Sequence, residues 1–519
     1  MRFLAPLILL LPGVLAAQDG PANPIDRYFD AHWKEIGIQA GAPADDYEFL
    51  RRASLDVLGR LPKPEEIRAF EKSKDRAKKV DELLENPEAA EFFADSWLRL
   101  LMNYHFDETA PLRISFPAFR AYLKDVHAKD LPYRDFVTQL LSDVGDYKQK
   151  PASNFILAAL DPAMVEPPHE LTSRTTRIFL GIQIHCARCH DHPFDKYTQE
   201  DFWGLTAFFN GLKPKSRQTF DGFGVKVMIE PKGLMMAIPD SKTEVSAHFL
   251  DGRPPEDPKQ PLKSYAKYVV EHPQFPRAIV NRLWAHFMGR GFVEPVDKFS
   301  DKTRPNHPAL LEALCGEFMK GETRLRPLMR TILLSKAYQA GCDSSKEHDP
   351  LTHARMIVKP QNPVQLLNTL VYTLNMDVFF KQFYKSFIEN KELPEGYRNP
   401  EVFRMFLHQF TSGLLAPTGT APEATKYTGS VRLALKLMNS NDLQGLVKAE
   451  WGRLAEILKE RESAPDRLNE IFYTLLSRPP HADEKERYLE YLKRKNGDKK
   501  AFEDVYWVLL NSSELYFNH

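Results

Sequence analysis

Apolar residues recur every three or four positions in one segment of this chain after another. In PIDRYFDAHWKEIGI they fall at Ile25, Phe29, Trp33 and Ile36, which is the spacing of one face of an α-helix. The segments FPRAIVNRLWAHFMGRGF and KAFEDVYWVLLNSSELYF repeat this pattern in the second half of the chain. The chain also contains 39 prolines, and proline interrupts helices rather than continuing them. The sequence therefore predicts a mainly α-helical protein built from many short helices.

One stretch departs from the helical pattern. Residues 213–250 hold short β-branched and alternating runs broken by Gly, Pro and Asp, as in GFGVKVMIEPKGLMMAIPD, so a small β insert is expected there. The proline-rich stretch DGRPPEDPKQPL follows and indicates a boundary. We predict two helical domains, at residues 18–212 and 263–519, joined by a β insert and linker at residues 213–262.

The first residues, MRFLAPLILLLPGVLAAQDG, have the layout of a secretory signal peptide. Arg2 provides a positive start, an apolar run follows, and Ala16 lies in a small-residue cleavage pattern. The apolar run is shorter than the roughly 18 residues that a membrane span needs. We expect residues 1–17 to be removed and the mature protein to be exported, periplasmic or extracellular, with no membrane span left.

Composition excludes some classes of function. Lys plus Arg and Asp plus Glu both total 70, so the net charge is zero, and this balance does not favour nucleic acid as a partner. The Walker A, G-x-G-x-x-G, G-x-S-x-G and H-E-x-x-H motifs do not occur in the sequence. The ordinary nucleotide-binding, hydrolase and zincin classes therefore lack support, and no catalytic residue is assigned.

Residues 185–192 read HCARCHDH, a dense group of side chains that bind metals or react with electrophiles. Within it, Cys186, Cys189 and His190 form the pattern C-x-x-C-H, which is typical of covalent c-type haem attachment. Two thiols three positions apart can each form a thioether with one haem, and the adjacent histidine then serves as its axial ligand. Export agrees with this prediction, because bacteria attach c-type haem outside the cytoplasm.

Three alternatives stay open for this segment. Zinc or another divalent metal could be held by the two thiolates with His185, His190, Asp191 or His192, an arrangement that would suit hydrolytic chemistry. Zinc ligands normally come from two separated segments, however, and this group is local. A second alternative is a disulfide between the two cysteines, in a redox protein or in a non-catalytic envelope protein, although thioredoxin-like motifs follow a strand and this motif is expected to end an apolar helix.

The third alternative concerns the flanking residues alone. Taken singly, His185, Asp191 and His192 are interpreted as a solvated helix end. A haem also needs a sixth ligand or an open face, and Met and His are the usual choices. The candidates are Met164, His169, Met228, Met235, Met236 and His286. Of these, His286 is a candidate for the distal ligand if the two domains pack across the cluster. The favoured alternative for its segment is a helix that ends at Gly289 or Gly291, with structural pairing between arginine and aspartate.

Two further groups of residues are interpreted from local pattern only. Cys315 lies within one helical segment and Cys342 follows the next, and both a disulfide and two free thiols stay open for them. Arg51, Arg52 and Asp56, in LRRASLDVLGRLP, are interpreted as a solvated helix face, and the helix is expected to stop at Gly59.

Several longer stretches resemble a known pair of domains. The first set is IDRYFDAHWKEIGI, FLRRASLDVLGRLPKPEEIRAF and FLGIQIHCARCHDHPFDKYTQEDFWGLTAFF, and the second includes NRLWAHFMGRGFVEPVDKFS, LMRTILLSKAYQ and LLNSSELYF. Together they resemble the secreted planctomycete-type cytochrome-like domain of unknown function, the PSCyt type, followed by its usual PSD-type partner domain. The resemblance implies a secreted two-domain protein and supports Cys186, Cys189 and His190 as the haem-attachment residues. Many relatives carry a separate cytochrome-like domain at the N-terminus. None is expected here, so the redox partner is expected to be another periplasmic protein.

Overall fold

The computed structural model describes residues 23–102, 115–160, 167–219, 222–229, 233–342, 349–376, 385, 438–439, 441–450 and 452–519. The predicted signal peptide at residues 1–17 lies outside these residues. None of the described helices is both long enough and apolar enough to cross a membrane.

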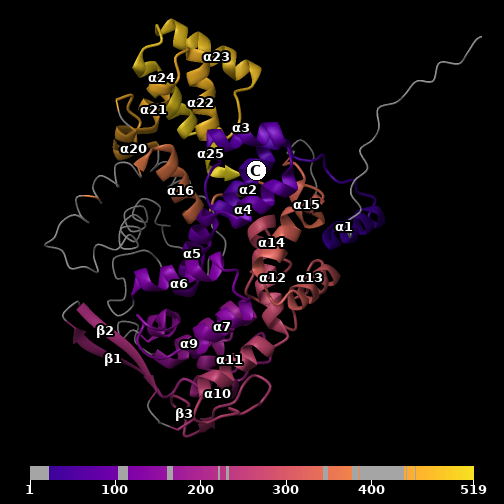
Figure 1. The fold of residues 1–519 in the computed structure, drawn as a ribbon. Helices are drawn as coiled ribbons and strands as arrows, with labels where there is room; N and C mark the ends of the chain where they lie inside the picture. The colour runs from indigo at the N-terminus through magenta and orange to yellow at the C-terminus, as the bar shows by residue number, and fades with distance from the viewer. Residues whose placement is uncertain are drawn as a thin grey trace, which may run out of the picture.

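Helices dominate the described part of the chain, which confirms the mainly α fold class (Figure 1). The helices before the β insert are α1 (Pro24–Glu35), α2 (Asp46–Leu58), α3 (Pro64–Ser73), α4 (Arg76–Glu85), α5 (Pro87–Met102), α6 (Phe116–Ala128), α7 (Tyr133–Ser142), η1 (Pro151–Ser153), α8 (Asn154–Ala159), α9 (Pro167–Thr175), η2 (Thr176–Leu180), η3 (His185–Arg188) and α10 (Gln199–Ala207). Those after it are α11 (Pro261–Glu271), α12 (Gln274–Met288), α13 (Pro308–Lys320), α14 (Leu325–Leu333), α15 (Lys336–Gln339), η4 (Pro350–Thr352), α16 (Pro363–Thr373), α20 (Asn441–Leu446), α21 (Gly452–Glu460), α22 (Ala464–Leu476), α23 (Ala482–Arg494), α24 (Lys499–Leu510) and α25 (Ser513–Tyr516).

The described strands form three antiparallel pairs. They are β1 (Leu212–Thr219) with β2 (Gly222–Ile229), β3 (Met235–Ala237) with β4 (Glu244–Ser246), and β5 (Lys359–Pro360) with β6 (Phe517–Asn518). The first two pairs are the small β insert predicted for residues 213–250. The pair β3–β4 packs beside α10, and both pairs lie in the part of the molecule away from α22–α24 (Figure 1).

The hydrophobic packing has two centres. One cluster draws buried residues from Ile25 to Val364, on both sides of the β insert. The second runs from Leu366 to Leu515 and also includes Leu55 and Leu61. The boundary predicted near residue 263 therefore does not separate two hydrophobic cores, because helices from both sides of it, such as α7 and α11, pack together.

Helix α2 lies between these two cores. Every residue from Phe49 to Leu58 is buried, whereas an ordinary surface helix buries only one face. Its N-cap Asp45 accepts from two backbone N–H groups, and Gly59 ends it in the left-handed conformation at φ 67°, as the sequence predicts. The same burial makes one prediction wrong: Arg51, Arg52 and Asp56 are 1%, 0% and 0% exposed rather than solvated.

These buried charges have partners from distant parts of the chain. The Asp56 carboxylate accepts hydrogen bonds from Tyr338 Oη at 2.9 Å, Lys359 Nζ at 2.9 Å and Asn518 Nδ2 at 2.8 Å. Arg51 donates through Nη2 to the carbonyl oxygens of residues 514, 515 and 517, at 2.5–3.2 Å. Buried charge is tolerated where hydrogen bonds satisfy it. Protein groups therefore make the hydrogen bonds that water was expected to make with these side chains.

Candidate functional site

The chain reaches the cysteine segment through a helix that stops early. Helix α9 continues into the π-helical turn η2, which ends at Gly181 with φ 66°. A Cβ at Gly181 would lie 2.7 Å from Phe299 Cδ2, so the position needs glycine for both its conformation and its close contact. The prediction of a helix running into the motif is therefore wrong, because Ile182 and Ile184 leave the helix and are buried before the motif begins.

The cysteines lie in a short 3₁₀ turn. Element η3 covers His185–Arg188, and Cys189 is its C-cap. Cys186 lies within the turn, and Cys189 follows three positions later at its end. Both are exposed and both are free thiols, whereas Ala187 between them is 0% exposed. The turn is thus anchored by the alanine and presents two adjacent thiols to solvent.

Arg188, between the two cysteines, is held from both ends. Its carbonyl oxygen accepts hydrogen bonds from Trp203 Nε1 at 3.0 Å and Gln199 Nε2 at 3.2 Å. Its guanidinium Nη1 lies 2.9 Å from Nε2 of the buried His169 on α9. Sequence reasoning did not assign Gln199 or Trp203 to the site. Their spacing of four residues on α10 puts both on one helix face, which is the signal that could have found them.

The polar residues around the cysteines mostly bond to their neighbours. His190 Nδ1 lies 2.7 Å from the carbonyl oxygen of Asp191, and His192 Nδ1 accepts from the backbone N–H of Phe194 at 3.2 Å. Asp191 Oδ1 accepts from the backbone N–H of Gln199 at 2.8 Å. The aspartate therefore caps the start of α10.

His185, the remaining polar residue of the segment, faces α9. Its Nδ1 lies 3.2 Å from the hydroxyl oxygen of Ser173. Within the described ranges, no three His, Cys, Asp or Glu side chains converge as a group that could hold a metal ion. The alternative metal site would require these side chains to move closer together than they lie in the described structure.

Comparison with protein families gives two matches, one on each side of the β insert. Residues 24–214 match the PSCyt2 family, described as "Protein of unknown function (DUF1549)". Residues 265–370 match the PSD1 family, described as "Protein of unknown function (DUF1553)". The chain carries a PSCyt2 domain followed by a PSD1 domain. No curated protein and no solved structure gave a significant match.

The PSCyt2 segment contains the cysteine turn, and the PSD1 segment contributes to its support. Asp297, in the PSD1 segment, accepts from Gln183 Nε2 at 3.0 Å and from Arg177 Nη1 at 3.3 Å. Arg282 donates to the carbonyl oxygen of Ile178 at 3.4 Å, and burial lowers its pKa. Arg282 and Asp297 of the PSD1 segment therefore fix the chain just before the turn.

His286 of the PSD1 segment has a different environment from the one predicted. Its Nε2 lies 2.8 Å from the backbone carbonyl oxygen of Asp56, and its ring packs against Phe92 and Phe93 of α5. Burial lowers its pKa. Since Nε2 is already engaged with α2, the geometry does not support His286 as a distal ligand to a haem at the cysteine turn. Of the other candidates, His169 lies beside the turn, and Met164 lies outside the described residues.

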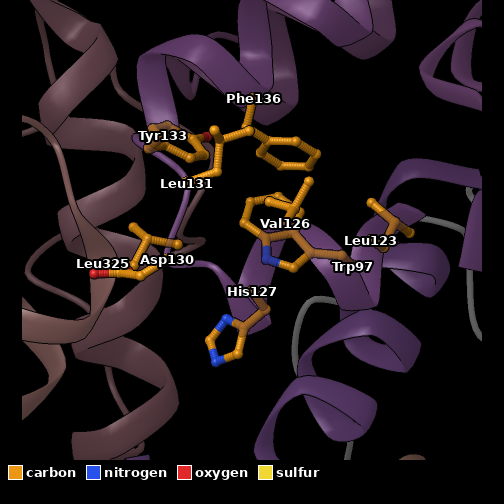
Figure 2. A pocket seen from close by; sticks show the side chains of 9 residues that line it. All are labelled: Trp97, Leu123, Val126, His127, Asp130, Leu131, Tyr133, Phe136 and Leu325. Atoms are coloured by element: carbon orange, nitrogen blue, oxygen red, sulfur yellow. The ribbon is translucent and has the colours of Figure 1, made fainter. Parts of the chain in front are cut away.

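The PSCyt2 domain also contains a small cavity, separate from the cysteine turn (Figure 2). It is lined by Trp97, Leu123, Val126, His127, Asp130, Leu131, Tyr133 and Phe136, together with Leu325 from α14. The His127 ring stacks on Phe93 with 4.4 Å between ring centroids, and its Nε2 is buried without a hydrogen-bond partner. Burial lowers the pKa of His127 to about 3, so this imidazole stays neutral at physiological pH.

Proposed function

We propose that this chain is exported, binds one c-type haem covalently at Cys186 and Cys189 with His190 as axial ligand, and acts in electron transfer or redox chemistry. One observation supports the proposal: both cysteines of the C-x-x-C-H segment are exposed free thiols, at one short 3₁₀ turn. This arrangement matches what attachment to one planar group requires, because both sulfurs must reach the same reagent.

The chemistry of the donor set fits haem attachment. In each thioether, the thiol S–H bond and the vinyl C=C π bond break, and one S–C bond and one C–H bond form, so no external oxidant enters the balance. When bound, haem would supply an iron centre that takes up and releases one electron.

The hydrogen bond of His190 fits the role of axial ligand. A carbonyl oxygen only accepts hydrogen bonds, so Nδ1 of His190 must donate its proton to Asp191. In the neutral ring, Nε2 then carries the lone pair. Metal-binding histidines generally donate their other ring N–H to such an acceptor, which fixes the tautomer and the ring orientation. No described residue forms a hydrogen bond with Nε2 of His190, so this atom is open to a metal.

The partner implied by this proposal is a redox protein outside the cytoplasm. The predicted signal peptide supports export. The turn packs against α10 and exposes both cysteines, and α10 lies at the end of the molecule away from α22–α24 (Figure 1). Electron transfer to another protein requires such access, because the donor and acceptor must approach closely.

The test is to express the chain with its leader in a host that has the c-type maturation system. The absorption spectrum and the intact mass of the purified protein are then measured. We expect a Soret band and a mass gain of one haem, both lost in the double variant C186A/C189A. The variant His190→Ala should keep the covalent mass gain but shift the Soret and Q bands.

A protein of apo mass without a Soret band would overturn the haem proposal. Elemental analysis and thiol counting on the same sample then distinguish the other two uses of the segment. Stoichiometric zinc would indicate the metal alternative, and the loss of two titratable thiols would indicate a disulfide between Cys186 and Cys189.

A further inference from the structure

The carbonyl oxygen of Arg188 is the fixed point of the cysteine turn. It accepts two side-chain hydrogen bonds, from Trp203 Nε1 at 3.0 Å and Gln199 Nε2 at 3.2 Å. The peptide group of Arg188 leads directly into Cys189. Cys186 lies two positions before Arg188, within η3. Two donors on one carbonyl restrict the rotation of that peptide plane, and this rotation sets the direction in which Cys189 projects.

Helix α10, which supplies both donors, is firmly held. Thr198 and Asp201 form a capping box at its start, a device that satisfies otherwise free backbone N–H groups. Phe202 and Leu205 are 0% exposed, and Trp203 is 6% exposed. The carboxylate of Asp191 also accepts from the first backbone N–H of α10 at 2.8 Å. The cysteine turn is therefore bound to one rigid helix at two points, the carbonyl oxygen of Arg188 and the carboxylate of Asp191.

We propose that Gln199 and Trp203 are positioning residues that preform the C-x-x-C turn, so that one bifunctional reagent reaches both sulfurs without rearrangement of the chain. For haem as that reagent, the inference rests on the proposed function. The arrangement of the thiols, in contrast, is a property of the protein without cofactor, and it can be tested there.

The probe is phenylarsine oxide, a trivalent arsenical that bridges two neighbouring thiols. Two As–S bonds form and the arsenic oxygen leaves as water, so the step involves no change of oxidation state. Trp203→Phe keeps an aromatic ring but removes the N–H donor, and Gln199→Leu keeps the approximate shape but removes the amide donor. We expect the double variant Q199L/W203F to bind the arsenical about tenfold more weakly, because two hydrogen bonds that fix the turn are lost.

A second reagent separates positioning from folding. Iodoacetamide reacts with one thiol at a time, so its rate at Cys186 and Cys189 should change less than twofold in the double variant. The double variant C186A/C189A sets the background from Cys315 and Cys342, whose pKa values burial raises to about 12 and about 11. Matched controls are Trp507→Phe on α24 and Gln149→Leu at an exposed position, and both should bind the arsenical like the original chain.

The outcomes are distinguishable from those of the haem experiment. Unchanged arsenical binding in a folded Q199L/W203F variant would overturn the positioning role, whether or not the original chain takes up haem. If Trp203→Phe does not fold, Gln199→Leu alone decides, with about a threefold loss expected for one hydrogen bond. A chain that takes up no haem but shows the predicted arsenical pattern would refute the haem proposal and leave the preformed thiol pair in place.

Discussion

Asp56 is a carboxylate at 0% exposure whose charge must be offset entirely by protein groups. Lys359 supplies the opposite charge, while Tyr338 and Asn518 supply neutral hydrogen bonds. Burial lowers the pKa of Lys359, because loss of water disfavours the charged ammonium group. A buried ion pair of this kind stabilises the fold only as a complete set, because removing one partner leaves the other charge without compensation.

We expect Lys359→Met to lower the free energy of unfolding by about 3–5 kcal/mol, because it leaves Asp56 buried without a cation. The double variant D56N/K359M should recover most of this loss, since the uncompensated charge is then absent. Urea unfolding of the three proteins measures both effects. A loss below about 1 kcal/mol in Lys359→Met would mean that the neutral hydrogen bonds suffice.

His127 gives the protein a predictable sensitivity to acid. Its pKa is lowered from 6.5 to about 3, first by burial and then by the charge of Arg326. Between these two values the unfolded chain binds a proton on this residue and the folded chain does not. Stability is therefore fully present above pH 6.5 and falls as the pH decreases toward 3, by up to about 1.4 kcal/mol per pH unit.

We expect His127→Phe to remove this contribution, because the stacked ring remains but nothing titrates. The free energy of unfolding of the variant, measured by urea unfolding at pH 7, 6, 5 and 4, should decrease less steeply toward acid than that of the original chain. Parallel curves for the two proteins would contradict the assignment.

For single residues, the sequence predicted the features that depend only on residues nearby in the chain. The C-x-x-C-H spacing and the stop at Gly59 are both local, and the stop is confirmed. The burial of Arg51 and Asp56 was missed because their partners lie more than 280 residues away in sequence. A pattern of charges on one helix contains no information about such distant groups.

Among the elements, the π-helical turn η2 determines where the cysteine segment begins. Gly181 ends it at φ 66° and contacts Phe299 so closely that a Cβ would lie 2.7 Å from the ring. Gly37 ends a turn after α1 with a similar φ of 69°, but a Cβ there would meet nothing within 4 Å. Replacing Gly37 by alanine therefore measures the free-energy cost of the backbone conformation alone. Replacing Gly181 adds the cost of steric overlap with Phe299.

We expect Gly37→Ala to lower the free energy of unfolding by about 1 kcal/mol, the cost of a left-handed alanine. Gly181→Ala should cost about 2–4 kcal/mol, because overpacking against Phe299 adds to the backbone term. Thermal and urea unfolding measure both losses. Equal losses for the two variants would show that Phe299 moves aside at little cost.

The helix before the cysteine turn illustrates why element boundaries were only partly predictable. The apolar spacing of residues 170–180 was recognised correctly as helical. The stop at Gly181 was missed because a glycine inside an apolar run is compatible with both a helix interior and a C-cap. Only the packing of Phe299, which comes from beyond the β insert, decides between them.

In the whole molecule, Arg51 joins the two hydrophobic cores. It belongs to α2, and it donates to Ser477 Oγ and to the carbonyl oxygens of residues 514, 515 and 517. Burial lowers its pKa to about 10, which still leaves the guanidinium charged near neutrality. Because α2 packs in both cores, this one side chain couples the stability of α22–α25 to that of the N-terminal helices.

We expect Arg51→Met to weaken this coupling more than it weakens either core. In the original chain, hydrogen exchange followed by mass spectrometry should give similar opening free energies for α5 and α22. In the variant, peptides from α22 and α24 should exchange at least tenfold faster than before, while peptides from α5 change less than threefold. Uniform acceleration across all of these helices would contradict a coupling role.

The organisation of the whole molecule was the hardest level to predict. Composition shifts and proline-rich stretches located the β insert correctly, and the two family matches lie on either side of it. They did not reveal that one core spans the insert, because packing between α7 and α11 depends on which helix faces meet in space. Sequence periodicity identifies an apolar face but not its partner.

The pairing of β5 with β6, and the hold of Arg51 on residues 514–517, have a consequence for biosynthesis. A ribosome releases α2 more than 400 residues before these partners exist. Until then Arg51 lacks the carbonyl oxygens that accept from its guanidinium, so α2 cannot settle in its final place. We expect the chain to acquire its native structure only after its last residues have been made, which would suit the export proposed for it.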